Sequence, residues 1–600
     1  MTFILVYSLA ALAFLIVFNL LLKKRSSRNN TLKNRPKKTR KPAATEKDTA
    51  LAKEETLQQN QTEELLPAAP SEEPKAQAPS KNNNYPDHLV TLLMVLILGA
   101  FVTILNQTLL NNALPKIMNS FNVTTNTAQW LSTAYMLVNG VVIPFSAFLI
   151  ETISSRKLFI FAMSMFGIGT LIAGVAPTFS ILLIGRMVQA VGAGIIMPLM
   201  TTLFMVLFPP EKRGSVMGIM GVAMIFAPAI GPTLSGYIVE YSTWRLLFWV
   251  VLPIALLDII LALIYFKDVG ERSYPKLDVW GLIFSTIGLS SLLYGFSEAG
   301  NDGWTSTTVE VTIAIGVIFL IAFVVREFLT DHPLLNLRVF KFPIFTLASV
   351  INLIVTMSLF ASMILLPVYL QNIRGFTPVE SGLLLLPGAI IMGIMSPIAG
   401  ALFDKVGARP LAIVGLLVMI FTTWEFGNLT LDDSLLYIGT LYTIRSFGIS
   451  LVMMPIMTEA LNSVPRELSA HATATFNTLR QIAGSLGTAI LVTVMSTRTN
   501  VHREIANSVY TTNNMHFMQS LQEKIMHLMQ SMGISAQEAQ QTIIGQIVTY
   551  VSRHSAVQGI NDAFIVATLV TILGLIVSIF LSRAKIPGIH KTYDASNESK

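Results

Sequence analysis

Fifteen runs of about 18 or more predominantly apolar residues recur along this chain. Each run is long enough to cross the hydrocarbon core of a bilayer as one helix. Only 12% of the 600 residues are charged, about half the share in soluble globular proteins. The sequence therefore predicts an all-α polytopic membrane protein. The expected helices are 3–22, 88–108, 127–150, 157–176, 178–203, 214–238, 246–266, 277–297, 308–328, 344–371, 378–402, 409–428, 434–457, 473–496 and 561–582.

The basic residues indicate which helix ends face the cytoplasm. If residue 87 is cytoplasmic, thirteen Lys and Arg residues lie in short loops on that side and three lie outside. Both ends of the fourteen-helix body should then be cytoplasmic. This clustering beside the membrane explains the net charge of +7 without nucleic acid. The absence of Cys excludes disulfides, thiol catalysis and Cys-based zinc sites.

The first apolar run stands apart from the other fourteen. Lys23, Lys24 and Arg25 follow it at once, and no basic segment precedes it, which favours an uncleaved anchor with its N-terminus outside. The next segment is basic, then acidic, and too polar to fold. We interpret it as a tether in preference to a docking arm, with its basic half against anionic lipid head groups.

The stretch GVAMIFAPAIGPTLSG at 221–236 is apolar yet rich in helix-weakening residues. Pro removes a backbone donor and Gly removes the side chain, so such a helix bends and lets a neighbouring backbone approach. Lipid tolerates this only where other protein covers the freed backbone. The residues that mark this helix are Gly218, Gly231, Pro232 and Gly236.

Two loops of similar pattern indicate an internal repeat. GALFDKVGARP at 400–410 carries Asp404 and Arg409, and the weaker AFLIETISSRK at 147–157 carries Glu151 and Arg156. Asp404 follows Glu151 by 253 residues, which predicts two related six-helix halves with two helices inserted between them. The expected parts are an anchor at 1–22, a disordered cytoplasmic linker at 23–86, a first half at 87–266, inserted helices at 277–328, a second half at 342–585 that includes an extracellular helical hairpin at 497–560, and a cytoplasmic tail at 586–600.

These loops and the Gly/Pro helix occur together with RMVQAVGAGIIMP, WRLLFWVVLP, LNQTLLNNALP and HATATFNTLRQIAGSLG. In combination the chain resembles the fourteen-helix drug:proton antiporter group of the major facilitator superfamily, in its lincomycin-efflux-like multidrug exporter branch, over residues 86–585. The resemblance implies the major facilitator fold, with two pseudo-symmetric six-helix halves, two inserted helices and here one extra N-terminal helix. It also implies that 218–236 is the group's antiporter helix.

One position departs from the group's usual pattern. The group commonly has Asp in the first body helix where this chain has Asn106. An amide does not ionise at physiological pH, so Asn106 cannot carry a proton. It could bind a neutral or zwitterionic substrate or make an interhelical contact, and both interpretations stay open. The candidates for the substrate cavity are Asn106, Tyr135, Asn139 and Gln189.

Ionisable residues inside a membrane are costly and therefore functional candidates. Asp258 lies near the middle of the sixth body helix, where burial disfavours the charged form. It is either a proton carrier or a structural Asp paired with a hydroxyl or amide. Arg186 is its expected partner, because a buried guanidinium needs a carboxylate or carbonyls. Glu459 is the second candidate, although its predicted position at a helix end suggests access to water.

The repeated loops predict gate chemistry at the cytoplasmic side. Asp404 with Arg409, and Glu151 with Arg156, could bind the basic loop or the positive N-terminus of an adjacent helix and hold that side shut. The alternative is a pair of solvated salt bridges of little consequence.

Residues 497–560 should lie outside the cell. Apolar residues such as Leu521 and Leu528 recur there at helical spacing, and Ser535 with Glu538 forms a capping-box pattern. We expect a helical hairpin that rests on the outer mouth.

No phosphate-binding loop, His-Glu-x-x-His motif or nucleophile elbow occurs, so neither an enzyme nor a metal or cofactor site is expected. The main expectation is a proton-coupled secondary exporter of drugs or other amphipathic small molecules, working by alternating access as a multi-pass monomer in a bacterial cell membrane. Its partners would be the substrate, protons and the lipid bilayer. The alternatives are an exporter of an endogenous lipid, peptide or nucleotide-like molecule, and a non-transporting membrane sensor.

The N-terminal extension, residues 1–85, contains none of the motifs, so we expect it to be dispensable for export. A chain that starts near Asn84 should insert and export like the full chain, because one helix on about sixty flexible residues docks weakly. Membrane abundance and efflux of both chains in one efflux-deficient host check this. Equal abundance with lost efflux would make the first helix part of the mechanism.

Overall fold

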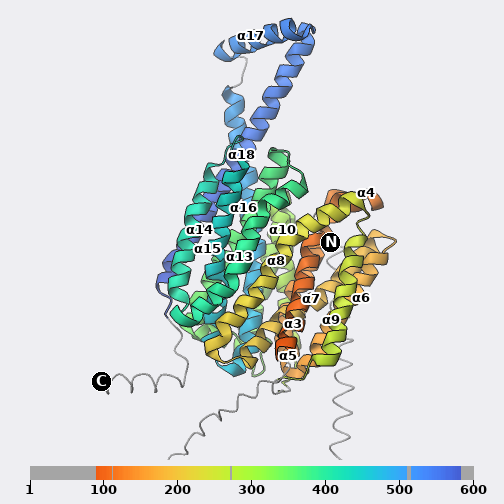
Figure 1. The fold of residues 1–600 in the computed structure, drawn as a ribbon, viewed down its shortest axis with the longest axis vertical. Helices are drawn as coiled ribbons and strands as arrows, with labels where there is room; N and C mark the ends of the chain where they lie inside the picture. The colour runs from red at the N-terminus through yellow and green to blue at the C-terminus, as the bar shows by residue number, and fades with distance from the viewer. Residues whose placement is uncertain (1–88, 111–112, 270–272, 274, 510–514, 583–600) are drawn as a thin grey trace, which may run out of the picture. The chain divides into compact units, whose positions relative to one another are not determined.

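The computed structural model describes residues 89–582 except 111–112, 270–272, 274 and 510–514. The expected anchor at 1–22, the linker at 23–86 and the tail at 586–600 lie outside the described residues. Thirteen helices in the described part are long and apolar enough to cross a membrane. The Gly- and Pro-rich helix α8 packs among them as the fourteenth helix of the bundle (Figure 1).

All fourteen body helices expected from the apolar runs are present. The first half comprises α3 (Leu89–Leu109), α5 (Thr125–Thr152), α6 (Ser155–Val175), α7 (Phe179–Leu207), α8 (Pro210–Tyr241) and α9 (Leu246–Tyr265), with the short α4 (Leu114–Phe121) after α3. The inserted pair is α10 (Val279–Asp302) and α11 (Thr307–Leu329). The second half comprises α12 (Pro343–Pro367), continued by a π-helical turn (Val368–Ile373), then α13 (Pro378–Val406), α14 (Ala408–Glu425), α15 (Leu435–Asn462), α16 (Ser469–Val509), α17 (Met515–Met532) and α18 (Ala536–Ile579).

Local sequence sets where these helices start. The side chains of Thr124, Ser154, Thr178 and Ser434 each accept a hydrogen bond from a backbone N–H three residues later, at the starts of α5, α6, α7 and α15. Gly407 separates α13 from α14 with φ of +83°, a conformation that favours glycine. Ser154 and Gly407 thus fix the starts of the helices that follow the repeated loops at 147–157 and 400–410.

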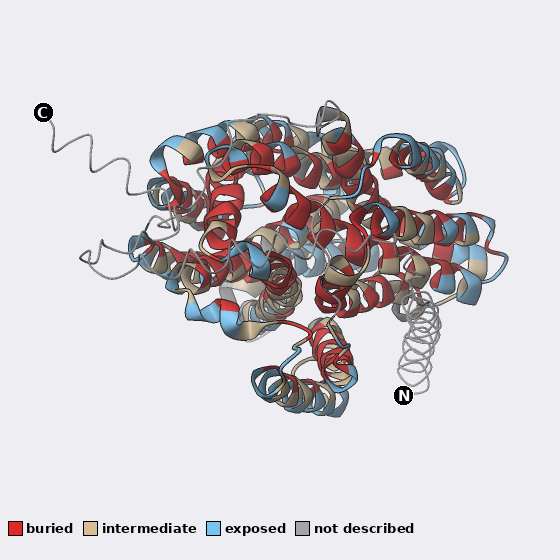
Figure 2. Cartoon of the chain, turned by 90° about the horizontal axis from the view of Figure 1, so that it is seen from below, coloured by how far each residue is buried: buried red, intermediate tan, exposed pale blue. Residues whose placement is uncertain are grey.

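The outer surface of the bundle is apolar, as contact with lipid requires. On α11 the exposed side chains are the aliphatic Val317, Ile318, Ile321, Val324 and Val325. Figure 2 shows buried residues gathered where helices face one another. The inserted α10 packs on α11, on α5 of the first half and on α16 of the second half. The inserted pair therefore contacts both halves.

The two halves meet most closely along α8 and α13, where glycines remove the side chains between them. A Cβ on Gly218 would lie 2.6 Å from the carbonyl oxygen of Ser396 and 2.7 Å from Cα of Pro397. A Cβ on Gly400 would collide with the backbone of Gly214. Nothing larger than glycine fits this contact, which is typical of closely packed membrane helices.

The outer hairpin differs from the sequence expectation. The helices predicted at 473–496 and 561–582 are too short, because α16 continues to Val509 and α18 already begins at Ala536. With 44 residues α18 is roughly 66 Å long, about twice the hydrocarbon thickness. The hairpin thus consists of extensions of α16 and α18 that project beyond the other helices, with α17 at the far end (Figure 1). The capping box of Ser535 with Glu538 is confirmed.

The α8–α13 contact predicts a large effect of added volume. Gly218→Leu should destabilise the detergent-solubilised protein by about 1–3 kcal/mol, because the new side chain must push two backbones apart. Gly545→Leu is the matched control, since a Cβ at Gly545 meets no atom within 4 Å. Thermal unfolding of both variants checks this. Equal midpoints for the two variants would contradict the packing described here.

Candidate transport sites

Arg186 on α7 forms a buried polar network with three of the four residues proposed for the cavity. Its Nη1 donates to Oε1 of Gln189 at 3.0 Å and to the backbone oxygen of Asn106 at 3.5 Å. Its guanidinium lies 4.3 Å from the ring centre of Tyr135. Gln189 in turn donates to Thr170 of α6 at 2.8 Å. The network joins α3, α5, α6 and α7. Asn139 lies one turn beyond Tyr135 on α5 and is half-buried.

Asp258 does not pair with Arg186, which corrects the sequence expectation. Asp258 is fully buried on α9, and neither carboxylate oxygen has a hydrogen-bond partner among the described residues. It faces α3, because a Cβ on Gly99 would lie 2.7 Å from its Oδ2 and 3.0 Å from Phe159. The packing of α9 therefore places Asp258 beside Gly99 and without a hydrogen bond to Arg186.

The second half contains a similar buried arginine that the sequence analysis missed. Nη2 of Arg445 on α15 donates to the backbone oxygen of Ser358 at 2.7 Å and to its Oγ at 3.0 Å, and Nε donates to Thr423 at 3.3 Å. Like α7, α15 is the fourth helix of its half. A basic residue in the middle of an apolar helix is a signal that the sequence already carried.

At the end of α13 expected to face the cytoplasm, Asp404 binds the N-terminal end of α8. Oδ1 accepts from the backbone N–H of Gly214 at 2.9 Å. Oδ2 accepts from the N–H of Ser215 at 3.0 Å and from its hydroxyl at 2.7 Å. A carboxylate is favourable at a helix N-terminus, so the contact ties the two halves together. Arg409, the other member of the repeated motif, is exposed at the start of α14.

A second contact between the halves corrects the expected pairing of Glu151 with Arg156. Oε1 of Glu151 on α5 lies 2.9 Å from Nε2 of His471 on α16. Nδ1 of His471 accepts the N–H of Asn336 at 3.3 Å. Arg156 instead donates to the carbonyl oxygen of Leu263 on α9. The reason is direction: α5 ends facing the start of α16, whereas Arg156 begins α6 and turns toward α9.

Helix α8, which carries the residues of the expected antiporter motif, contacts both halves. Its outer part packs on α3, where a Cβ on Gly231 would collide with Thr108 and the hydroxyl of Ser235 donates to the carbonyl of Leu109 at 2.5 Å. Pro232 and the half-buried Gly236 continue this part of α8. Its inner part carries Gly218 and packs on α13.

Glu459 differs from the expectation of easy access to water. It lies near the end of α15 as expected but is only 2% exposed. Helix ends in a membrane protein can thus be covered by neighbouring helices, which sequence position alone does not reveal.

The Asp404 contact predicts a change in amide exchange. Asp404→Asn replaces charge-assisted bonds by neutral ones, which costs about 1 kcal/mol and should speed exchange of the Gly214 and Ser215 amides roughly fivefold. Asp432→Asn, at an exposed position, should leave them unchanged. Hydrogen–deuterium exchange of a peptide from the start of α8 measures this, and equal rates in both variants would count against the contact.

Comparison with known proteins agrees with this architecture. The family model described as Major Facilitator Superfamily matches residues 96–488. The chain is 52% identical over 492 residues to the uncharacterized MFS-type transporter YhcA of Bacillus subtilis, covering 82% of this chain and 92% of that protein. It is 38% identical over 500 residues to the lincomycin resistance protein LmrB of the same organism, covering 83% and 97%.

A solved structure supports the fold alone. The human organic anion transporter MFSD10 superimposes with a TM-score of 0.53 at 12% sequence identity, covering 82% of this chain and 99% of that chain. The family-model match spans well over half of the chain, and the relatives align over most of their own length. The protein is a multi-pass cell-membrane protein that belongs to the major facilitator superfamily.

Proposed function

We propose that the protein is a proton-coupled antiporter that exports drugs or other amphipathic small molecules by alternating access. The family is one of transporters rather than enzymes, and relatives named for lincomycin and multidrug resistance support drug efflux. The substrate, protons and the lipid bilayer are then its partners, and we propose that the monomer is the working unit.

The observation that carries alternating access is the contrast between the two kinds of contact between the halves. Along α8 and α13 the contact is backbone against backbone and tight. At the cytoplasmic ends it consists of the polar contacts of Asp404 and Glu151. Polar contacts can exchange partners with water at low net cost, so the Glu151–His471 contact between α5 and α16 can open while the close-packed α8 and α13 act as the pivot. The Arg186 network, with Asn106, Tyr135 and Gln189, is proposed to border the substrate path.

The proposed proton carrier is Asp258. A charged carboxylate without partners inside a membrane loses several kcal/mol of solvation, so the state seen here suits a protonated side chain. Export would require that another conformation opens Asp258 to water and lets the proton leave. The structural alternative, a bond to a hydroxyl or amide, has no support among the described residues.

This assignment predicts loss of coupling in Asp258→Asn. Proteoliposomes with the variant should fail to accumulate labelled lincomycin against its gradient when a pH gradient is imposed, with at least a roughly tenfold loss of concentrative uptake. Downhill exchange of lincomycin should persist, because the amide keeps the shape of the carboxyl group. The matched control is Asp268→Asn, at an exposed position just beyond α9.

The outcomes separate the candidate functions. Concentrative uptake by Asp258→Asn at the wild-type level would remove the assignment and move the proposal to Glu459 or Glu151. Proton-driven flux of lipids, peptides or nucleotides but not of drugs would favour an endogenous substrate. Absence of any flux from the folded wild-type protein would favour the sensor.

A further inference from the structure

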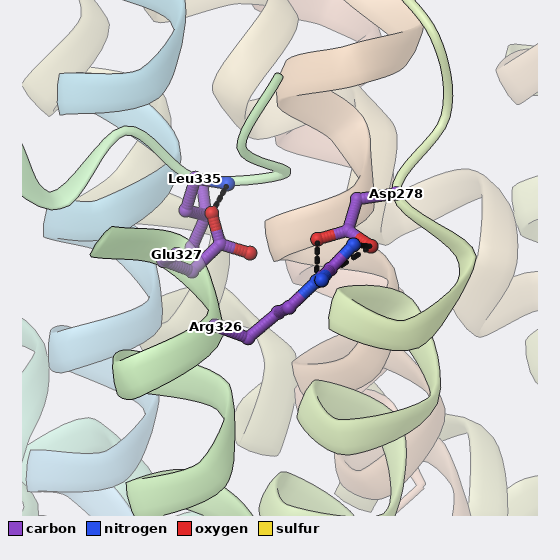
Figure 3. A network of polar contacts seen from close by, with 4 residues as sticks. All are labelled: Asp278, Arg326, Glu327 and Leu335. Carbon is purple, nitrogen blue, oxygen red and sulfur yellow. Dashed lines mark hydrogen bonds and ion pairs between the residues drawn. The ribbon is translucent and has the colours of Figure 1, made fainter. Parts of the chain in front are cut away.

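The inserted helix pair contains a second buried carboxyl group in which one oxygen has no hydrogen bond. Glu327, in the last turn of α11, is 3% exposed. Its Oε2 accepts the backbone N–H of Leu335 at 3.1 Å (Figure 3). Its Oε1 has no hydrogen-bond partner among the described residues. In Figure 3 this oxygen points toward Asp278.

The neighbouring arginine does not compensate Glu327. Arg326 directs its guanidinium to Asp278, with Nε 3.1 Å from Oδ2 and Nη2 3.3 Å from Oδ1 (Figure 3). Gly281 lets both carboxyl groups border one face of α10, since a Cβ there would lie 2.8 Å from Oδ2 of Asp278 and 2.9 Å from Oε1 of Glu327. Two carboxyl groups therefore lie near one guanidinium, which donates its hydrogen bonds to Asp278 and none to Glu327.

Glu327 lies at the start of a chain of contacts that ends at the cytoplasmic gate. It holds the backbone of Leu335, and the next residue, Asn336, donates its N–H to Nδ1 of His471. Nε2 of His471 lies 2.9 Å from Glu151 in the first half. The loop between α11 and α12 thus connects the carboxyl group of Glu327 to a contact between the halves.

We propose that Glu327 is a proton-binding site whose occupancy controls the 330–336 loop and, through His471, the gate contact with Glu151. A carboxylate accepts the Leu335 N–H through a charge-assisted bond, and a protonated carboxyl group accepts it more weakly. Binding of a proton at Glu327 therefore loosens the loop. The role of this site in export rests on the proposed function, whereas the response of the loop to pH does not.

Other ionisable groups face the same region and must be separated from Glu327. Asp278 and Arg326 flank it on the inserted helices, and His471 faces the loop from α16. Arg338 and Lys341, on the short helix that precedes α12, are exposed. Two histidines also lie in this region, the exposed His332 on the loop itself and His471 on α16.

Cysteine labelling tests the proposal without a substrate, because the natural chain has no Cys. Leu337→Cys places one half-buried thiol beside Asn336. In inside-out vesicles its rate of alkylation, corrected for thiolate fraction, should rise about fivefold as pH falls from roughly 9 to 5. With Glu327→Gln the rate should be high and independent of pH, since a neutral amide imitates the protonated group.

Glu310→Gln is the matched control, because Glu310 is an exposed carboxylate in the first turn of the same helix. It should keep the pH response. A response that survives in folded Glu327→Gln and disappears in His471→Gln would overturn the proposal, as would a wild-type rate without pH dependence. Absence of proton-driven lincomycin flux in the wild-type protein would contradict the proposed function, whereas the labelling result would still test the response of the loop to pH.

Discussion

The close approach of α8 and α13 is the contact on which the two halves depend. Glycines on both helices bring backbone against backbone at Gly218 and Gly400, so added volume there has no room. Dispersion forces then hold the helices together without help from the hydrophobic effect, which is weak between helices already surrounded by lipid. At one end of this contact hydrogen bonds are added to the close packing, because Asp404 binds the N-terminal end of α8. The proposed rocking motion needs a tight helix contact, as between α8 and α13, close to polar contacts that can open, as between Glu151 and His471.

The buried charges of this protein fall into two groups. Oxygens of carbonyl, hydroxyl and amide groups accept hydrogen bonds from Arg186 and Arg445, so these arginines join neighbouring helices in each half while they remain charged. Asp258 and Glu327 lack such compensation at one or both oxygens. The low-dielectric interior penalises an unpaired charge far more than a paired one. Residues of the first group therefore suit fixed structure, and those of the second suit reversible proton binding.

Helix positions could be predicted from the sequence because lipid imposes a minimum length and a composition on each span. The prediction was wrong where the apolar runs stop, because α16 continues past residue 496 and α18 begins before residue 561. Arg498, in the extension of α16, lies 2.5 Å from Asp562 of α18. The repeated loops predicted Asp404 and Glu151 at helix ends, but the contacts with the N-terminal end of α8 and with His471 could not be predicted from the motifs. Local motifs determine which side chains lie at a helix end, but they do not determine which residues those side chains contact.

The sequence by itself determined the class, the number of body helices and the family. These follow from apolar length and from motifs whose spacing is local. Only the tertiary structure decided which face of each helix turns inward, and hence the partners of Glu151 and Glu327 and the burial of Asp258 without a hydrogen bond. Rotation of a helix about its axis depends on packing against neighbours that lie up to hundreds of residues away in the chain. A periodic pattern carries no record of those neighbours, because in a membrane both the lipid-facing and the protein-facing sides are apolar.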